Sequence, residues 1–432
     1  MNKNNYSKLI IFIAAVVIFS QQAISAETIT SLNKFLNSLP VKKVILLKAE
    51  EPFKEEYEVV LNQLLDHKNV SGATFPQRIF VSFVDSAAPV VLITEGYSCG
   101  KNHLRELSEI LGANQIRVEY RFYGESGPDS IPWKYLNYFQ SSNDYHYIRT
   151  VFSKYFRGRW ISTGWSKGGQ TALIYRRFFP EDAAATVAYD APLNRSLTEG
   201  RIDRFFEKVG TPECRKKIIG FQRLVLQNRD NVLPLFKGYC KSRGYTFERI
   251  TPLKAMEYSV LEYPFSFWQY HHIPCSEIPD STNSSEQIFE QLKKVVYLGS
   301  YTDRAFDSIS MYQFSTELGY YGYVTKNVAD LLSQSGKNFS NTAFAPSFIK
   351  HEFSPSFMRD IVTWLLSYGN KIIYIYGEND PWSAPSIEIP DSIDAVKVYV
   401  KDGNHFSFIR TFPERERSDI ITKIRKWIDS VN

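Results

Sequence analysis

Short apolar runs alternate with segments of helical spacing along the first part of the chain, and this alternation limits the folds open to it. The run "PVVLITEG", residues 89–96, is apolar without interruption and ends at a glycine, as expected of a strand buried on both faces. Strands that alternate with helices form a mostly parallel sheet flanked by helices. We therefore expect strands at 44–47, 78–85, 89–96, 115–124, 159–163 and 183–192, and helices at 102–112, 142–156 (with Asn143 as N-cap) and 167–180.

The alternation stops after Asn194 and resumes after about Lys350. The stretch between them is mainly of helical character, with many aromatic residues and polar loops. After it we expect a helix at 357–369, strands at 371–380 and 395–400, and a closing helix at 418–431. The pattern predicts one α/β domain, residues 27–194 and 351–432, interrupted by a helical cap insertion at 195–350.

The N-terminus has the pattern of a signal peptide. Lys3 and Lys8 precede an uncharged apolar run at 9–19, which is too short to span a membrane. Cleavage near Ala26 is expected, with Ser25 as the alternative, so residues 1–26 would be removed. We predict a secreted or periplasmic protein without stable membrane insertion after removal of the signal. The alternative is an uncleaved membrane anchor.

Charge and cysteine content narrow the class of protein further. The formal net charge of +5 comes from both signs mixed along the chain, so nucleic-acid binding is not expected. An even number of cysteines in an exported chain permits two disulfides, and Cys214 with Cys240 is the most local pairing. Free buried thiols are the alternative. The cysteines are Cys99, Cys214, Cys240 and Cys275.

One serine lies in a glycine-rich turn between an expected strand and an expected helix. The sequence "GWSKGG" places Ser166 between Gly164 and Gly168, in the Gly-x-Ser-x-Gly pattern of a nucleophile elbow. Such a turn is sharp and strained, so its neighbours must be small. The helix that follows directs N–H groups toward the serine, where an oxyanion would form. Ser166 is therefore the candidate nucleophile, and a turn that only packs helix on sheet is the alternative.

A serine nucleophile needs a histidine base and an acid that orients the histidine. In strand–helix hydrolases these follow in the order Ser, acid, His, at the carboxyl ends of strands. Asp380 follows the expected strand 371–380 and His405 follows the strand 395–400. Order and placement predict a Ser166–Asp380–His405 triad, with Glu378 as the alternative acid.

The oxyanion hole needs two N–H donors. The amide of Lys167, directly after the nucleophile, is one candidate, and the amide of Tyr97 in the loop after "VVLIT" is the other, with Gly96 as alternative. We expect the Lys167 side chain to be solvated or to pack, because His405 already supplies the base.

Several of these segments together resemble one family. "VVLITEGYSCG", "VEYRFYGESGP", "STGWSKGGQTALIYRRFFP", "YGENDPW" and "GNHF" are similar to the secreted tripeptidyl aminopeptidase family of serine peptidases (PS-10 type), which is related to the prolyl carboxypeptidase and dipeptidyl peptidase group. The likeness covers about residues 75–410, and "MYQFSTELGYYGY" resembles the Q-x-C-T-E segment of those relatives. Tyr120 stands where the carboxypeptidases have a histidine, and Ser315 where they have a cysteine, which favours the aminopeptidase branch.

The resemblance implies an exported α/β-hydrolase with a helical cap that releases short peptides, such as tripeptides, from free N-termini and favours proline. An aminopeptidase must hold an α-ammonium, and Glu95, Glu125 and Glu317 are the candidate carboxylates within the motifs. Helix capping and pairing with arginine, as expected between Glu119 and Arg121, are the alternatives. Aromatic residues such as Trp165, Tyr189, Trp382 and the stretch "EYPFSFWQY" could line a proline pocket or form ordinary core.

Peptide substrates are thus the expected partners, and hydrolysis needs no cofactor beyond water. No metal site is predicted, because His271 and His272 lack a third ligand. Two alternative functions remain: a carboxylic-ester hydrolase on the same scaffold, and a non-catalytic binding protein of hydrolase fold.

Overall fold

The computed structural model describes residues 30–270, 273–333 and 339–430. The predicted signal peptide with its cleavage site near Ala26 lies outside the described residues, as do His271 and His272. The chain forms two compact units, Met1–Leu39 and Pro40–Asn432. In the first, helix α2 (Ser31–Asn37) begins at an N-cap, where the Thr30 hydroxyl accepts a hydrogen bond from the Asn33 amide at 3.1 Å.

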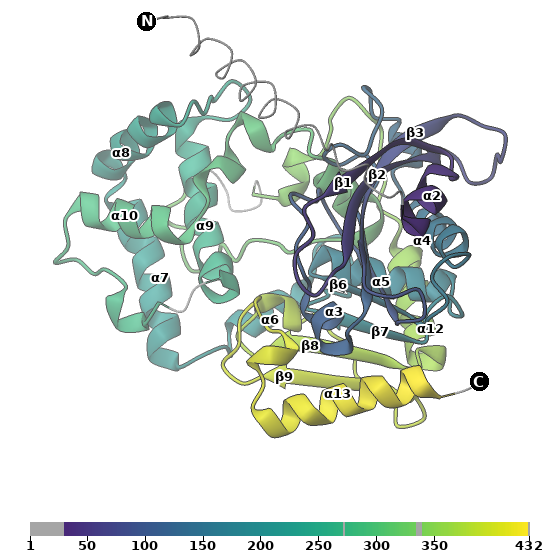
Figure 1. The fold of residues 1–432 in the computed structure, drawn as a ribbon. Helices are drawn as coiled ribbons and strands as arrows, with labels where there is room; N and C mark the ends of the chain where they lie inside the picture. Colours follow the sequence, from purple (N-terminus) through teal and green to yellow (C-terminus); the bar gives the residue numbers. More distant parts are fainter. Residues whose placement is uncertain (1–29, 271–272, 334–338, 431–432) are drawn as a thin grey trace, which may run out of the picture. The chain divides into compact units, whose positions relative to one another are not determined.

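A nine-stranded sheet forms the centre of the second unit (Figure 1). Its strand order is β1-β2-β3-β5-β4-β6-β7-β8-β9. Pairing is antiparallel from β1 through β3 to β5 and parallel from β5 to β9, which confirms the expected mostly parallel α/β architecture. The strands are β1 (Val41–Leu47), β2 (Glu55–Leu64), β3 (Thr74–Phe83), β4 (Val90–Thr94), β5 (Asn114–Val118), β6 (Trp160–Trp165), β7 (Ala185–Tyr189), β8 (Ile372–Gly377) and β9 (Val396–Val400).

Strand β2 was not predicted. Its sequence "EEYEVVLNQL" carries three glutamates, which are uncommon in strands. Nevertheless Tyr57, Val59 and Leu61 recur every second residue and are buried, while the residues between them are less so. Antiparallel pairing with both β1 and β3 stabilises this strand, so cross-strand contacts outweigh the low strand propensity of its glutamates.

Helices cover both faces of the parallel strands, because alternate side chains point to opposite faces. Ile373 and Ile375 of β8 share a core with α3 (Glu106–Leu111) and α13 (Glu414–Asp429). Ile372 and Tyr374 share another core with α5 (Lys167–Phe178) and α12 (Pro355–Tyr368).

Helix α4 (Tyr138–Phe152) begins earlier than expected. The proposed N-cap Asn143 was wrong, since the side chain of Asn137 accepts the Gln140 amide hydrogen bond at 3.0 Å and caps the helix. None of the described helices is long and apolar enough to span a membrane.

Between β7 and α12 the described chain is helical and adds no strand to the sheet. Its helices pack around a core of their own, seen as the group α7 to α10 in Figure 1. The predicted cap boundaries, 195 and 350, remain a prediction. The helices are α6 (Gly200–Phe206), α7 (Pro212–Gln227), α8 (Arg229–Ser242), α9 (Pro252–Tyr270), α10 (Ser285–Val295) and α11 (Ile309–Gln313).

The most local cysteine pairing was wrong: Cys214 of α7 forms a disulfide with Cys275, while Cys99 and Cys240 are buried free thiols.

Pro264 lies inside α9 and cannot donate to the carbonyl of Val260. The Gln222 side chain of α7 donates to that carbonyl at 2.8 Å, so the helix continues past the proline.

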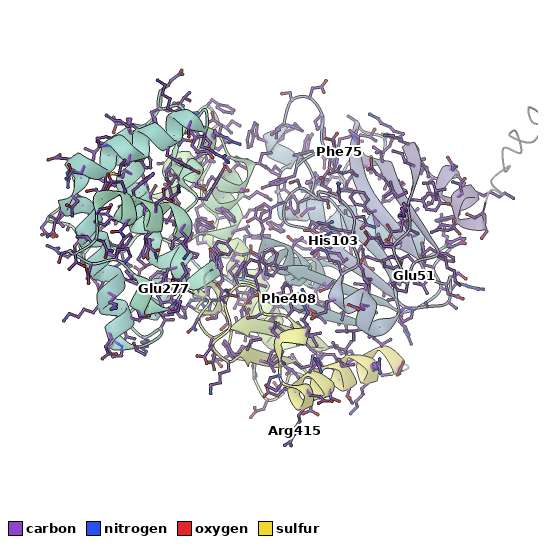
Figure 2. The ribbon with its side chains drawn as sticks, turned by 60° about the vertical axis from the view of Figure 1, so that its left-hand side comes forward. Glu51, Phe75, His103, Glu277, Phe408 and Arg415 are labelled. Atoms are coloured by element: carbon purple, nitrogen blue, oxygen red, sulfur yellow. A yellow bond between two sulfur atoms is a disulfide. The ribbon has the colours of Figure 1, made fainter. Side chains whose placement is uncertain are left out.

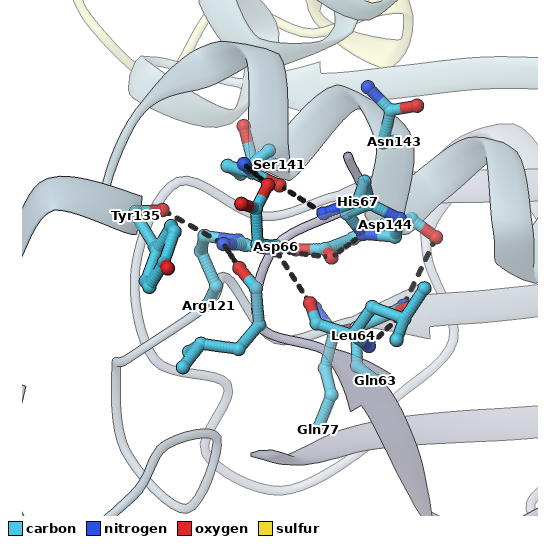
Figure 3. Close-up of polar contacts among 12 residues, drawn as sticks. Gln63, Leu64, Asp66, His67, Gln77, Arg121, Tyr135, Ser141, Asn143 and Asp144 are labelled. Carbon is cyan, nitrogen blue, oxygen red and sulfur yellow. Dashed lines mark hydrogen bonds and ion pairs between the residues drawn. The ribbon is translucent and has the colours of Figure 1, made fainter. Parts of the chain in front are cut away.

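The expected Glu119–Arg121 pair was also wrong. Glu119 pairs with Arg78 at 2.6 Å. Arg121 is fully buried and binds Asp144 of α4 through two nitrogens, at 2.7 and 2.6 Å (Figure 3). Its remaining N–H groups donate to the carbonyls of Leu64, Leu65 and Tyr135. The guanidinium also lies 5.2 Å from the ring centre of Phe75, labelled in Figure 2. This network ties α4 to the antiparallel edge of the sheet.

Replacing Arg121 by Met should lower the free energy of unfolding by about 3–5 kcal/mol, because the buried Asp144 carboxylate would lose its arginine and keep only the 2.7 Å contact with His67. Denaturant titration measures the change. Arg177→Met, which breaks the exposed Arg177–Asp360 pair, is the matched control and should cost less than about 1 kcal/mol. Equal losses for the two variants would contradict the assigned importance of the buried pair.

Candidate active site

Ser166 occupies a strained turn between β6 and α5. Its φ and ψ of 58° and −128° lie in a region that residues with a side chain rarely adopt. The amide of Ser166 donates to the Tyr189 carbonyl at 2.8 Å, which fixes the turn to the neighbouring strand β7. No residue with a side chain fits at the flanking glycines, because a Cβ on Gly164 would lie 2.2 Å from the Gly168 carbonyl oxygen. The local structure is therefore a nucleophile elbow that exposes its serine.

Asp380 and His405 meet at the carboxyl ends of β8 and β9. The Asp380 Oδ2 lies 2.7 Å from His405 Nδ1, and both side chains are buried. A carboxylate only accepts hydrogen bonds, so Nδ1 carries the proton and Nε2 is left as a base. The main chain of His405 is held on both sides, because its amide donates to the Gln269 carbonyl at 2.9 Å and its carbonyl accepts from Trp165 Nε1 at 2.7 Å.

Ser166 and His405 line the same cavity. In this structure the Ser166 hydroxyl makes no hydrogen bond with a described residue. The alternative acid Glu378 is exposed and accepts a hydrogen bond from the Asp402 amide at 3.1 Å, which directs it away from His405.

A third acid, Asp190, lies beside the Asp380–His405 pair. One carboxylate oxygen of each acid and a ring nitrogen of His405 lie within 4.8 Å of one another. Asp190 Oδ1 accepts from the Gly377 amide at 3.1 Å, while Oδ2 has no hydrogen-bond partner among the described residues. Burial, and then the Asp380 carboxylate, raise the pKa of Asp190 well above its ordinary value. Two adjacent buried carboxylates repel each other when both are charged, so this site favours a protonated Asp190 that can donate to Asp380.

Replacing Asp190 by Asn should leave the acid limb of the pH–rate profile in place, because a neutral group replaces a neutral group. If Asp190 were ionised, its removal would take a negative charge from the imidazole and move that limb to lower pH by about one unit or more. The kcat/KM profile between pH 4 and 9 measures this. Asp190→Ala, which removes the donor to Asp380, should lower kcat where Asp190→Asn does not.

The two expected oxyanion donors lie on neighbouring segments. A Cβ on Gly96 would approach Lys167 Cβ to 2.7 Å, so the loop after β4 runs directly against the elbow. Neither the Lys167 amide nor the Tyr97 amide donates to a described residue.

The Lys167 side chain is buried, which rules out the solvated alternative and leaves packing. Its ammonium donates to the Gly96 carbonyl at 2.6 Å and lies 4.0 Å from the ring centre of Tyr120. Burial lowers the pKa of Lys167 well below its ordinary value, and the charge of Glu317 opposes that shift. The hydrogen bond from Lys167 to Gly96 thus holds the loop that carries Tyr97. The other rings within 6 Å of its ammonium belong to Tyr97, Tyr123 and Tyr138.

Lys167→Met should lower kcat by about 10- to 100-fold with a smaller change in KM, because the Gly96–Tyr97 loop loses its anchor and a donor placed about 1 Å away is much less effective. Steady-state kinetics separate the two constants. Lys241→Met, at an exposed position on α8, is the control. An unchanged kcat for Lys167→Met would show that the loop is held by other contacts.

The cavity beside Ser166 has a volume of about 1050 Å³ and lies between the sheet edge and the helical segment. Trp165 and Trp382, both predicted substrate contacts, line it, whereas Tyr189 does not. Glu95 also lines it but is paired with Arg105 at 2.8 Å and Arg117 at 2.5 Å.

The other predicted ammonium ligands lie elsewhere. Glu125 is exposed and outside the cavity. Glu317 accepts from the Tyr138 amide at 3.0 Å, and burial raises its pKa to about 8. Neither lines the cavity beside Ser166.

Sequence reasoning missed two acids of this region. Asp190 follows a strand directly, as Asp380 nearly does, and this position was the available signal. Glu262 begins the stretch "EYPFSFWQY", for which only the aromatic rings were predicted to line a pocket. The Glu262 side chain also lines the cavity.

The mostly parallel sheet, the strained serine turn after β6 and the covering helices define an α/β-hydrolase. The family model of PS-10 peptidase S37 matches residues 29–430, so the chain belongs to this family of serine peptidases. This confirms the family expected from the motifs.

A curated relative is prolyl tri/tetrapeptidyl aminopeptidase of Streptomyces mobaraensis. It is 31% identical over 389 residues, which cover 88% of this chain and 81% of the relative. Among solved structures, the proline iminopeptidase of Mycobacterium smegmatis matches with a TM-score of 0.45 and 11% identity over 82% of this chain and 96% of that one. A 2-hydroxy-6-oxo-6-phenylhexa-2,4-dienoate hydrolase of Rhodococcus sp. strain RHA1 matches with a TM-score of 0.37 and 10% identity over 89% and 100% of the two chains.

Proposed function

We propose that this serine peptidase is exported and releases tripeptides from free N-termini, with Ser166, His405 and Asp380 as its catalytic triad. The observation that carries the triad is the buried 2.7 Å contact between Asp380 and His405, in the same cavity wall as the strained Ser166. The relative's printed activity, prolyl tri/tetrapeptidyl aminopeptidase, supports short peptides and proline as the substrate class.

Each residue has one role in the proposed reaction. Ser166 Oγ attacks the scissile carbonyl carbon while His405 Nε2 takes its proton, and the carbonyl oxygen becomes an oxyanion held by the Lys167 and Tyr97 amides. The intermediate collapses, the C–N bond breaks, and the leaving amine takes the proton from His405. Water then attacks the acyl-enzyme ester, gives a proton to His405, and frees the peptide as Ser166 recovers its hydroxyl.

Export is supported by two features. The N-terminal residues have the composition of a signal peptide. The Cys214–Cys275 disulfide is of the kind that persists in oxidising compartments.

Ser166→Ala should reduce kcat by about 10⁴- to 10⁶-fold, since the nucleophile is removed while the fold remains. Hydrolysis of a proline-containing tripeptidyl anilide measures it, with Ser242→Ala, an exposed serine of α8, as the control.

In the wild-type protein the rate should fall at acid pH, because a protonated His405 cannot act as base.

Paired substrates separate the proposal from its alternatives. Hydrolysis of short acyl esters without hydrolysis of the tripeptidyl anilide would exclude tripeptide release. Failure of a fluorophosphonate to label Ser166, under conditions that label another serine hydrolase, would exclude the triad.

A further inference from the structure

Glu262 of α9 is a buried carboxylate without a cation partner in the wall of the active-site cavity. Two carboxylates line this cavity, Glu95 and Glu262. Glu95 is neutralised by two arginines, whereas no Lys, Arg or His of the described chain pairs with Glu262. A buried carboxylate normally has a positively charged partner. The cavity therefore holds one site that a ligand's positive charge would complete.

Three hydroxyl groups orient this carboxylate. Tyr301 and Tyr321 donate to Oε2 at 2.8 and 2.7 Å, and Ser266 donates to Oε1 at 2.9 Å. Oε1 accepts only that one bond from the described residues, so it has capacity for another donor. Burial raises the pKa of Glu262 to about 7, and a bound ammonium would favour its ionised form.

Helix α9 sets the distance between this carboxylate and the catalytic centre. The Gln269 carbonyl is bound to the His405 amide, and Glu262 lies seven residues earlier in the same helix. At about 1.5 Å per residue the two positions are about 10 Å apart along the helix. Glu262, Ser266, Gln269 and Tyr270 all line the cavity, so this face of α9 runs along it.

An extended peptide covers about 3.3–3.6 Å per residue, so three residues span about the same 10 Å. We propose that Glu262 binds the α-ammonium group of the substrate and that its position on α9 sets the released peptide at three residues. This inference rests on the proposed function. It adds the group that binds the substrate's N-terminus and thereby fixes how many residues lie between that terminus and the cleaved bond. A peptide with its ammonium at Glu262 would place its third carbonyl beside Ser166.

The test compares two substrates on two proteins. Ala-Ala-Pro p-nitroanilide carries the free ammonium, and propionyl-Ala-Pro p-nitroanilide has the same shape without it. Glu262→Gln keeps an acceptor for the tyrosine hydroxyls but removes the charge. We expect this variant to raise KM for the first substrate by about 10- to 150-fold, the range for losing a hydrogen bond to a charged group, and to leave kcat/KM for the second unchanged.

Length is the second readout. Wild-type protein should prefer the tripeptidyl anilide over Ala-Pro and Ala-Ala-Ala-Pro anilides, and Glu262→Gln should lose this preference. Glu286→Gln, an exposed glutamate of α10 outside the cavity, is the matched control and should behave as wild type. Labelling of Ser166 by a fluorophosphonate at the wild-type rate would show that the variant is folded.

The outcomes separate the two levels of the proposal. If the wild-type protein cleaves none of the peptides, the proposed function fails. If it cleaves them but Glu262→Gln retains the preference for the free amine, the assignment to Glu262 fails alone. Should Glu262→Gln not fold, the wild-type ratio between the two substrates still decides whether a charge is recognised, and Tyr321→Phe, which removes one orienting hydroxyl, should reduce that ratio.

Discussion

The active site depends on how closely three backbone segments approach one another around Ser166. A Cβ at Gly168 would lie 2.6 Å from the Thr94 carbonyl oxygen, and one at Gly96 would collide with Lys167. The turn keeps its positive φ because the surrounding sheet, helix and loop leave the chain no other path. Strain at Ser166 and the position of the proposed oxyanion donors therefore have one common cause, which is the dense packing of glycine backbone.

The helical segment takes part in the same geometry through α9. Its Gln269 carbonyl holds the His405 amide, and its Phe265 packs against Trp382, two residues beyond Asp380. His405 and the segment after Asp380 are thus each braced by the helix that also lines the cavity beside Ser166. In the proposed function, the helix that contacts the peptide would also hold the proposed base and acid, so substrate selection and catalysis would share one structural element.

The sequence was most informative where the signal is local. Gly164, Ser166 and Gly168 mark the elbow within five residues, and Asp380 and His405 each follow an apolar strand, so the fold and the candidate triad could be proposed from pattern alone. Strand β2 was missed because its glutamates obscure the alternation of Tyr57, Val59 and Leu61. The Arg121–Asp144 pair and the Cys214–Cys275 bond join residues far apart in the sequence, and no local pattern indicates them. Asp190 and Glu262 look like ordinary polar residues in the sequence; their burial, and the lack of a lysine or arginine partner within the described part of the chain, distinguish them.

The disulfide has a consequence for where an intact protein can be made. It ties the first turn of α7 to a segment that begins shortly after α9 ends at Tyr270. In a reducing cytosol this tether would be open, and the end of α9 that carries Gln269 would lose its covalent restraint. Protein produced there would keep the same sheet but hold His405 less firmly than the disulfide-bonded form, so the content of free thiols would report how much of a preparation is fully bonded.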